Sequence, residues 1–551
     1  MTQNLALADL LFPKTNLTAQ DIAEKYPPRQ LPEGAAVTRL APSPTGFIHM
    51  GNLVPALTSK RLAQQSNGVF YLRIEDTDQK REVEGGVEAI IDGLEGFGIS
   101  FDEGDFGDSE IGAYAPYRQR RRADIYAVFA RQLVEQGLAY PCFCSEQELE
   151  DMRTKQQEQK ENFGYFGQWA ACRNLTFEQI KQKIDAGQSY VLRFRAPEDA
   201  TVRVKFTDLV KGDLEFPQNN MDLVLLKSDG IPTYHFAHAV DDHFMGTTHV
   251  VRGDEWLATL PMHLQLFDAL GFKRPKYLHI SPLMKMDGES KRKLSKRKDP
   301  ELALEFYHQE GFYPPAVIEY LLTLLNSNFE EWRIKNPETD NGEFKFSAKK
   351  MSNSGALFDL DKLNDISKNI LCKLTAQQIL DNLLIWSAKY DPEFFALLDK
   401  NNDYARDILQ IGRGVAKPRK DIATWSGAKE YMSFFYDEYF SPDYAFPENL
   451  AKEDISAILQ GYQQFYTQAA DQQDWFAKLK EFAAGLGFSP DTKEYKLDPD
   501  SYKGHVGDVS MVLRIAITGR AQSPDLYEVM NILGTQKTIE RLQRAEKCCC
   551  K

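Results

Sequence analysis

The feature that most constrains the fold is a strand–turn–helix–strand unit near the start of the chain. Residues 36–40 (AVTRL) predict a short strand, which runs into a turn rich in Pro and Gly, APSPTG. The spacing of apolar residues then predicts a helix over 52–65, and 69–74 (VFYLRI) predicts the next strand. This order implies parallel strands joined by a crossover helix, with ligands bound at the carboxyl ends of the strands.

The rest of the chain is too long to share one core. At 551 residues, three or more domains are expected. A very polar helical stretch at 146–161 and short strand-like runs at 190–195 and 202–206 indicate an insertion into the α/β domain. A strand over 222–227, followed by a strand through Tyr234, should return to that domain. From about residue 326, apolar spacings of three and four predict a mostly helical remainder.

Three properties of the whole sequence bound where the chain works and what it binds. The formal net charge is −14, which argues against general nucleic-acid binding but leaves recognition of one folded RNA open. No apolar run approaches the ~18 residues that span a bilayer, and the first residues lack the basic start of a signal peptide. Seven unevenly spaced cysteines do not make a disulfide framework. We therefore expect a cytoplasmic protein without a membrane segment.

Residues 42–52 (PSPTGFIHMGN) form the turn and the start of the helix that follows it. Two prolines stiffen the turn, and Gly46 permits backbone conformations closed to other residues. His49 and Gly51 stand at the start of the helix, where free N–H groups and the positive end of the helix dipole suit a triphosphate. The H-x-G triplet alone favours an ordinary turn with an exposed histidine, so its partners decide the interpretation.

A basic run at 291–298 (KRKLSKRK) supplies the lysines that such a phosphate site needs. A lysine loop after the second half of an α/β domain can stabilise charge during an in-line displacement, although the run alone favours a solvated basic loop. A second candidate, KMSNS at 350–354, has Asn353 where the second lysine is needed and lies in what we expect to be the next domain. We therefore predict that Lys293 and Lys296 serve the phosphates.

Longer strings place these residues together. The chain contains RLAPSPTGFIHMG at 39–51, LRIEDTD at 72–78, YHFAHAVDDHFMGTTHVVRGDEW at 234–256 and KLSKR at 293–297. In this order they resemble a class I glutamyl-tRNA synthetase of the bacterial type. The resemblance extends into ALFDLDKLNDI at 356–366, thins after about residue 390 and does not include residues 1–34. Such an enzyme has a Rossmann-type α/β catalytic domain with an α+β insertion, followed by mostly α-helical stem-contact and anticodon-binding domains.

Close relatives of that family differ at two of these strings. In glutaminyl enzymes the motif at the first turn resembles PPEPNG, and the motif at the second strand resembles DDTN. This chain has APSPTG and EDTD at these places. The short glutamyl-queuosine enzymes end soon after the lysine loop, but this chain continues for about 250 residues. Both differences favour the glutamyl-tRNA synthetases.

The resemblance implies a role for each matching residue. The glutamate pocket would comprise Arg39, Ser43, Glu75, Tyr234 and Arg252, with Arg39 on the substrate's side-chain carboxylate and Glu75 on its ammonium. His49, Lys293 and Lys296 would be catalytic. The residues that would bind ATP with Mg²⁺ are Pro42, Thr45, Gly46, His49, Gly51, Asn52, Trp256 and Lys296.

The same resemblance implies the partners and the division of the chain. Glutamate would be activated as glutamyl-adenylate and transferred to tRNA(Glu), and whether tRNA(Gln) is also charged stays open. A monomer is expected. The predicted parts are an N-terminal extension, two halves of the catalytic domain on either side of the insertion, a stem-contact domain and an anticodon-binding domain: 1–34, 35–140, 141–221, 222–325, 326–390 and 391–551.

Cys142, Cys144, Tyr165 and Cys172 lie in the insertion. Some members of the family hold a structural zinc there with a C-x-C pair, a tyrosine and a third cysteine. Thiolates in a tetrahedral arrangement suit Zn²⁺. However, the gap from Tyr165 to Cys172 is longer than in those members, and Asn174 stands where a histidine would add a ligand. A zinc site and a group of packed, unligated thiols therefore both stay open.

Two other classes of function compete with the synthetase interpretation. A tRNA-binding paralogue without chemistry should show damage in the phosphate or lysine motifs, and none is seen. A nucleotidyltransferase acting on a small molecule could share the H-x-G turn, but it needs neither the insertion nor the helical C-terminal part. The sequence therefore favours an ATP-dependent enzyme that charges tRNA.

Overall fold

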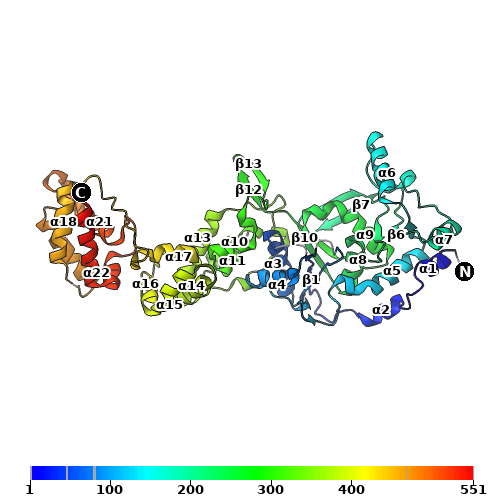
Figure 1. Ribbon diagram of the computed structural model, residues 1–551, viewed down its shortest axis with the longest axis horizontal. Coiled ribbons are helices and arrows are strands. Elements are labelled where there is room, and N and C mark those ends of the chain that lie inside the picture. The colour runs from blue at the N-terminus through cyan, green and yellow to red at the C-terminus, as the bar shows by residue number, and fades with distance from the viewer. Residues whose placement is uncertain (1–2, 45–47, 79–81, 468, 550–551) are drawn as a thin grey trace. The chain divides into compact units, whose positions relative to one another are not determined.

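A computed structural model describes residues 3–44, 48–78, 82–467 and 469–549 of the chain (Figure 1). It divides into two compact units. The first comprises Met1–Phe306 with Ile318–Asp359, and the second comprises Tyr307–Val317 with Leu360–Lys551. None of the helices in the described ranges is long and apolar enough to cross a membrane.

The first unit is built on parallel strands in the order β1–β2–β3, with β4 antiparallel at the edge. A second parallel pair, β10–β11, lies beside β1, where the Thr248 N–H donates to the carbonyl of Val37 at 2.9 Å. The strand bounds are β1 Val37–Leu40, β2 Val69–Leu72, β3 Glu103–Asp105, β4 Glu110–Ile111, β10 His249–Gly253 and β11 Lys276–Ile280.

Helices cover both faces of these strands. On one face, Tyr126 of α5 and Phe236 of α8 pack in a common core with Val37 and Tyr71. Thr38 points the opposite way, because side chains alternate along a strand, and its hydroxyl donates to a carbonyl of α3 at 2.9 Å. The helix bounds are α3 Met50–Gln64, α4 Gly86–Glu95, α5 Ala123–Glu135, α8 Tyr234–Phe244 and α9 Leu260–Ala269.

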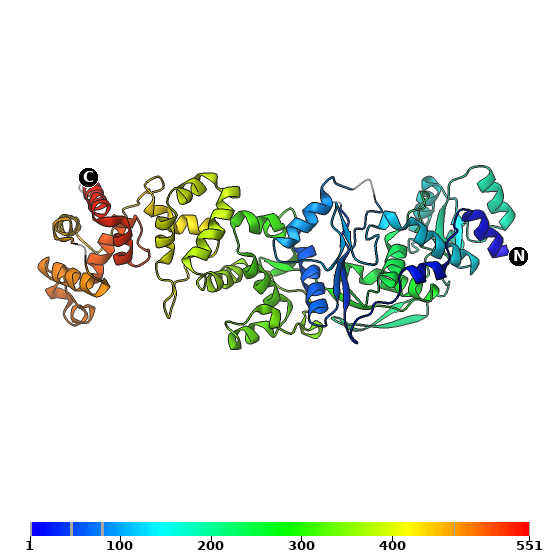
Figure 2. The same ribbon diagram turned by 90° about the horizontal axis from the view of Figure 1, so that it is seen from below.

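The N-terminal extension is folded onto this unit. Helices α1 (Gln3–Leu11) and α2 (Ala19–Lys25) place Ala8, Leu11 and Ile22 in the same apolar core as α5. Both views show the dark-blue helices beside α5 (Figures 1 and 2). The extension is therefore part of the catalytic unit's core.

The insertion has its own antiparallel sheet, in the order β5–β6–β9, and a separate hairpin of β7 and β8. Helix α6 stands out from it at the top of Figure 1. A second hairpin, β12–β13, contains the start of the lysine run and ends at Lys293, so Lys296 follows it. The bounds are β5 Ala139–Cys142, α6 Glu146–Glu158, α7 Phe177–Asp185, β6 Val191–Phe194, β7 Arg203–Asp208, β8 Gly212–Pro217, β9 Val224–Leu226, β12 Met284–Asp287 and β13 Ser290–Lys293.

The remainder of the chain is helical, as predicted, and α18–α22 group together in Figure 2. Its long last helix is interrupted at Gly534, whose φ is +79°. The bounds are α10 Leu304–Glu310, α11 Pro314–Leu325, α12 Phe329–Lys335, α13 Leu360–Leu371, α14 Ala376–Tyr390, α15 Pro392–Lys400, α16 Asn402–Gln410, α17 Trp425–Met432, α18 Lys452–Phe465, α19 Gln472–Gly485, α20 Thr492–Leu497, α21 Val506–Thr518 and α22 Leu526–Cys549. Short 3₁₀ helices are η2 Gln119–Arg122, η3 Gly167–Trp169, η4 Asp254–Thr259, η5 Pro300–Leu302, η6 Asn341–Glu343, η7 Ala348–Lys350, η8 Ser433–Phe435 and η9 Pro499–Ser501.

The α/β class is confirmed, but two expectations about strands are wrong. The strand predicted at 222–227 forms as β9, yet it pairs antiparallel with β6 in the insertion's sheet instead of joining the parallel strands. Tyr234 does not lie in a strand: it is the first residue of α8. After β9 the chain makes only a single bridge, from Leu226 to Pro232, and then starts the helix at the next turn. The apolar residues Phe236 and Val240 are four apart and are both buried on one side of the helix. This helical spacing outweighs the β-like composition of the residues before it.

Candidate active site

The turn after β1 leads directly into a cavity. His49 is the N-cap residue of α3, and its backbone N–H donates to the Asn52 side chain at 3.2 Å. A cavity of about 360 Å³ opens at this helix start. Its lining is His49, Met50, Gly51, Val54, Pro55, Gly253, Glu255, Ile280, Ser281, Pro282, Leu283, Lys293, Leu294, Lys296 and Leu302. The predicted phosphate turn and the predicted lysine loop therefore meet at one cavity.

The side chain of His49 can offer a ring nitrogen to a ligand bound in this cavity. Its Nδ1 is buried and has no hydrogen-bond partner among the described residues. Burial, with the nearby charges of Lys296 and Lys293, lowers the pKa of His49. A neutral imidazole that faces two lysines can hydrogen-bond to a ligand without adding to their repulsion. Gly51 leaves room for the ring, because a Cβ there would lie only 2.8 Å from it.

Hydrogen bonds to Asp299 hold the backbone of the lysine loop, whereas the side chains of Lys293 and Lys296 extend into solvent. Arg292 donates to both oxygens of Asp299 at 2.6 and 2.8 Å, and the backbone N–H of Ser295 donates to the same carboxylate at 2.8 Å. Lys293 and Lys296 are exposed and have no ion-pair partner in the described part of the chain. Their charge is therefore available to an anion.

The alternative basic segment at 350–354 borders the cavity through Ser281 but does not line it. The carbonyl of Asn353 accepts hydrogen bonds from Lys211 Nζ at 2.9 Å and from the Ser281 hydroxyl at 2.8 Å. None of residues 350–354 lines the cavity. Lys293 and Lys296 line it, which supports our choice between the two segments.

A buried network of charges sits next to the cavity, at the carboxyl ends of β1 and β2. Asp242 of α8 accepts from Arg73 at 2.5 Å and from Arg39 at 3.3 Å, and Arg73 also donates to Glu75 at 3.1 Å. His238 Nδ1 lies 2.7 Å from a carboxylate oxygen of Asp242. Two arginines and two carboxylates therefore hold each other with little exposure to solvent. Arg73, His238 and Asp242 were missed in the sequence, although they lie inside the strings that carry the resemblance.

Glu75 has an unusual titration for a carboxyl group. Burial raises its pKa to about 7, against the opposing charges of Arg73 and Arg39. A carboxylate that is buried and incompletely balanced can be held ionised by a cationic group of a ligand. Its backbone N–H donates to the carbonyl of Pro42 at 3.0 Å, which fixes Glu75 to the phosphate turn.

Tyr234, Arg252 and Trp256 lie together at the end of β10. The rings of Tyr234 and Trp256 have centroids 4.5 Å apart, and Arg252 Nη1 approaches the Tyr234 hydroxyl at 3.4 Å. Arg252 is buried, and its Nη2 has no hydrogen-bond partner among the described residues. Trp256 is half-buried against Tyr234 and is not among the residues that line the cavity.

The other predicted site residues that the structure describes are not among those that line the cavity. Pro42 and Asn52 do not line the cavity, and Ser43 is exposed on the turn. Thr45 and Gly46 lie outside the described residues. Glu255 and Ser281 line the cavity and were not predicted. Glu255 lies inside the string at 234–256, which could have indicated it, whereas Ser281 lies outside the strings that carry the resemblance.

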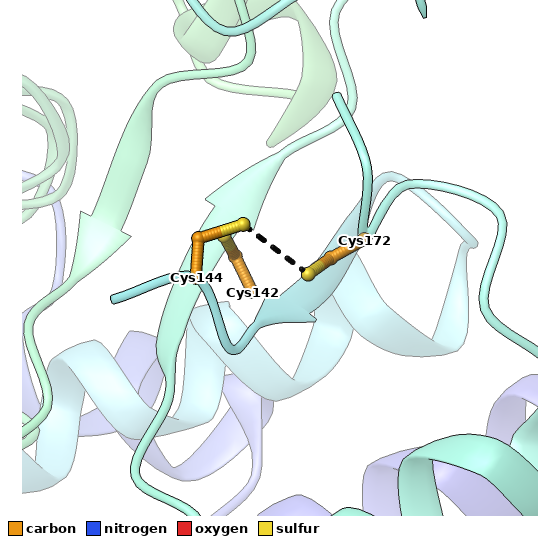
Figure 3. A group of neighbouring side chains, drawn as sticks. All are labelled: Cys142, Cys144 and Cys172. Atoms are coloured by element: carbon orange, nitrogen blue, oxygen red, sulfur yellow. Dashed lines mark hydrogen bonds between the residues drawn. The ribbon is translucent and has the colours of Figure 1, made fainter. Parts of the chain in front are cut away.

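Three cysteines converge in the insertion (Figure 3). The Sγ atoms of Cys142, Cys144 and Cys172 all lie within 4.8 Å of one another, and those of Cys144 and Cys172 are 3.6 Å apart. The Tyr165 hydroxyl lies 3.4 Å from Cys142 Sγ and 3.3 Å from Cys144 Sγ. Hydrogen bonds from the neighbouring thiols of Cys144 and Cys172 lower the pKa of Cys142. The four predicted ligands therefore form one group.

Comparisons with known proteins agree along the chain. Residues 35–365 match the family described as tRNA synthetases class I (E and Q), catalytic domain, and residues 500–546 match an anticodon binding domain. The chain is 52% identical over 541 residues to a glutamate–tRNA ligase of Acetivibrio thermocellus, covering 98% of this chain and 99% of that protein. A glutamate–tRNA ligase of Clostridium perfringens strain 13 is 48% identical, with 97% and 99% covered.

A solved structure matches as well. The crystal structure of a glutamate tRNA ligase from Elizabethkingia meningosepticum, in complex with its amino acid, superimposes with a TM-score of 0.74. The sequence identity is 28%, and the alignment covers 93% of this chain and 99% of that one.

Proposed function

Because the chain belongs to the class I tRNA synthetases, in the branch of the glutamate–tRNA ligases, we infer that it activates glutamate with ATP and transfers it to tRNA. The observation that carries this proposal is the pair of sites at the ends of β1 and β10. Arg39 and Arg252 are the next-to-last residues of these strands. The positive charge of Arg39 acts on Glu75, and this combination of charges suits an amino acid with an anionic side chain. His49 lines the adjacent cavity with the lysine loop, which suits a triphosphate.

We propose the following division of labour in the first step. Glu75 holds the ammonium of glutamate, while Arg39, Tyr234 and Arg252 receive its side chain, which leaves the α-carboxylate free to react. That carboxylate forms a bond to the α-phosphorus of ATP, and the bond to pyrophosphate breaks. His49 and Lys296 stabilise the charge that develops on the phosphate oxygens. Mg²⁺ bound with ATP would neutralise charge on the phosphates. A hydroxyl of the terminal adenosine of tRNA then forms an ester with the glutamyl group, and the bond to AMP breaks.

Charging of tRNA tests this proposal. The purified enzyme should attach labelled glutamate to tRNA(Glu) only when ATP is present. Failure to charge it would contradict the proposal, and tRNA footprints without charging would favour the inactive-paralogue alternative. The same assay with tRNA(Gln) decides whether that tRNA is a second substrate, which the proposal leaves open.

The pKa of Glu75 predicts how glutamate use depends on pH. The ionised form binds the ammonium, and the pKa in the free site is raised to about 7, so protonation removes this contact as the pH falls below that value. We expect kcat/KM for glutamate, which reports groups of the free enzyme, to fall about tenfold for each pH unit below ~7. A profile measured between about pH 5.5 and 8.5 should show this step.

Two variants make the assignment specific. Glu75→Gln has no titrating group there, so it should start from a much lower kcat/KM and lose the step near pH 7. Asp76→Asn changes the neighbouring carboxylate, whose oxygen accepts from the Arg120 backbone, and should keep the step. Persistence of the step in Glu75→Gln would contradict the assignment.

We propose that Cys142, Cys144, Cys172 and Tyr165 bind a structural zinc. In a tetrahedral site with Zn–S bonds of ~2.3 Å, sulfur atoms lie roughly 3.8 Å apart. The 3.6 Å separation of Cys144 and Cys172 is close to that value. The metal would fix the loop after β5 to the segment around Cys172, because ligands from both sides share one ion.

Metal analysis tests the zinc proposal. The purified chain should carry about one zinc per molecule, and Cys144→Ser should lose it. Cys372→Ser is the matched control, since that buried thiol lies in the second unit, and it should retain the zinc. Three reduced thiols without metal in freshly purified protein would instead support packed, unligated cysteines.

Three further assignments complete the proposal. We place the chain in the cytoplasm as a monomer. We also retain the division at residues 34, 140, 221, 325 and 390 into extension, split catalytic domain, insertion, stem-contact domain and anticodon-binding domain. The match of residues 500–546 to an anticodon binding domain supports the last of these.

A further inference from the structure

The buried arginines around the glutamate site differ in how their charge is balanced. Arg39 and Arg73 pair with Asp242, and Arg122 pairs with Asp241 at 2.7 Å. Arg252 is equally buried, yet among the described residues no carboxylate lies within ion-pair distance of its guanidinium. A buried charge without a counter-ion is costly, so an arginine in this condition needs another explanation.

Imidazoles replace the carboxylate on one side of Arg252. Its Nε donates to His279 Nε2 at 2.9 Å, and His279 Nδ1 lies 2.7 Å from Asp208. Arginine has no acceptor, so Nε2 must be unprotonated and the imidazole proton must be on Nδ1, donated to Asp208. Asp208 therefore fixes the tautomer in which His279 can accept from Arg252.

A second imidazole repeats this arrangement. Arg252 Nη1 lies 3.1 Å from His263 Nδ1, and His263 Nε2 lies 2.9 Å from His235 Nδ1. By the same reasoning, His263 accepts from Arg252 through Nδ1 and donates to His235 through Nε2. Burial lowers the pKa of both His263 and His279, which keeps the two rings neutral.

The arrangement leaves one part of the guanidinium open. Nε and Nη1 are occupied by the two rings, whereas the buried Nη2 has no partner in the described chain. Neutral acceptors satisfy hydrogen bonds without cancelling the positive charge. The charge of Arg252 is therefore left for a group that can reach Nη2.

We propose that His263 and His279 are positioning residues that hold Arg252 through neutral acceptor nitrogens, so that its uncancelled charge selects glutamate over glutamine. This inference rests on the proposed function. The carboxylate of glutamate balances the charge when it binds at Nη2. The amide of glutamine can accept a hydrogen bond but leaves the buried charge unbalanced, and discrimination then comes from the poorer complex.

Variants at His279 separate the acceptor from the packing. His279→Gln keeps an oxygen near the position of Nε2, whereas His279→Leu keeps bulk but no acceptor. Loss of a charged hydrogen bond should raise the KM for glutamate about tenfold or more in His279→Leu. His279→Gln should stay within about threefold of the wild type, with the KM for ATP unchanged in both.

A variant at His263 tests the charge itself. His263→Glu places a carboxylate within reach of Arg252 and should lower the ratio of kcat/KM for glutamate to that for glutamine at least about tenfold. His263→Asn keeps an acceptor near the position of Nδ1 and should preserve the ratio. If His279→Leu does not fold, His263→Leu compared with His263→Asn gives the same test of the acceptor.

The measurement is pyrophosphate exchange with glutamate and with glutamine, in the presence of tRNA. Equal damage in His279→Gln and His279→Leu, or an unchanged glutamate preference in folded His263→Glu, would overturn the inference. No exchange by the wild-type enzyme would instead contradict the proposed function. The two failures are therefore distinguishable.

Discussion

Lys296→Ala is expected to slow the formation of glutamyl-adenylate about 10²- to 10³-fold, the usual effect of removing one group that stabilises transition-state charge. Lys296 is exposed, lines the cavity at the start of α3 and has no ion-pair partner in the described chain. Pre-steady-state measurement of adenylate formation gives the rate directly.

The neighbouring lysine provides a control for this variant. Lys298 belongs to the same basic run but does not line the cavity, and its amine lies 3.9 Å from Asp287. Lys298→Ala should leave the adenylation rate close to that of the wild type. In Lys296→Ala, tRNA binding should change little. A parallel loss in both variants, or a large loss of tRNA affinity in Lys296→Ala, would make the run a tRNA contact rather than a phosphate clamp.

Arg252→Gln is expected to lower kcat/KM for glutamate by about 10³-fold. The reason is that the side-chain carboxylate of the substrate loses the buried positive charge that we propose as its partner. The residual activity should no longer favour glutamate strongly over glutamine. Gln is neutral and shorter and has fewer donors, so the change removes the charge together with the contact at Nη2. Steady-state exchange with each amino acid measures both effects.

An exposed arginine serves as the comparison. Arg274 pairs with Asp268 at the surface, where an ion pair contributes little to stability. Arg274→Gln should keep the wild-type kcat/KM and preference. Thermal unfolding of both variants should be recorded, since loss of activity through unfolding would lower the concentration of active enzyme without changing the preference.

Much of the site could be predicted because it lies in continuous strings. His49, Glu75 and Lys296 each sit within a motif that is recognisable without a structure, and the cavity gathers His49 with Lys296. The first strand–turn–helix–strand unit was predictable for a similar reason, because each element follows the previous one with little sequence between them. Elements that are neighbours in the sequence are also neighbours in that part of the fold.

Other parts depend on contacts between distant residues. His279 acts on Arg252 only because β10 and β11 pair in parallel register, with the two residues opposite each other. Asp208 reaches His279 from the insertion hairpin, and a single sequence gives no sign of that contact. The assignment of the substrate's side-chain carboxylate to Arg39 stays a prediction. Because Arg39 is already paired with Asp242, we propose that Arg252 supplies the charge that recognises this carboxylate.

The most direct test of the account is ATP–pyrophosphate exchange with glutamate, measured with and without tRNA(Glu). The predicted result is exchange that depends on glutamate, is strongest when tRNA is present and is lost in Lys296→Ala. Absence of exchange under both conditions, from enzyme shown to be folded, would contradict the claim that the site at the ends of β1 and β10 activates glutamate.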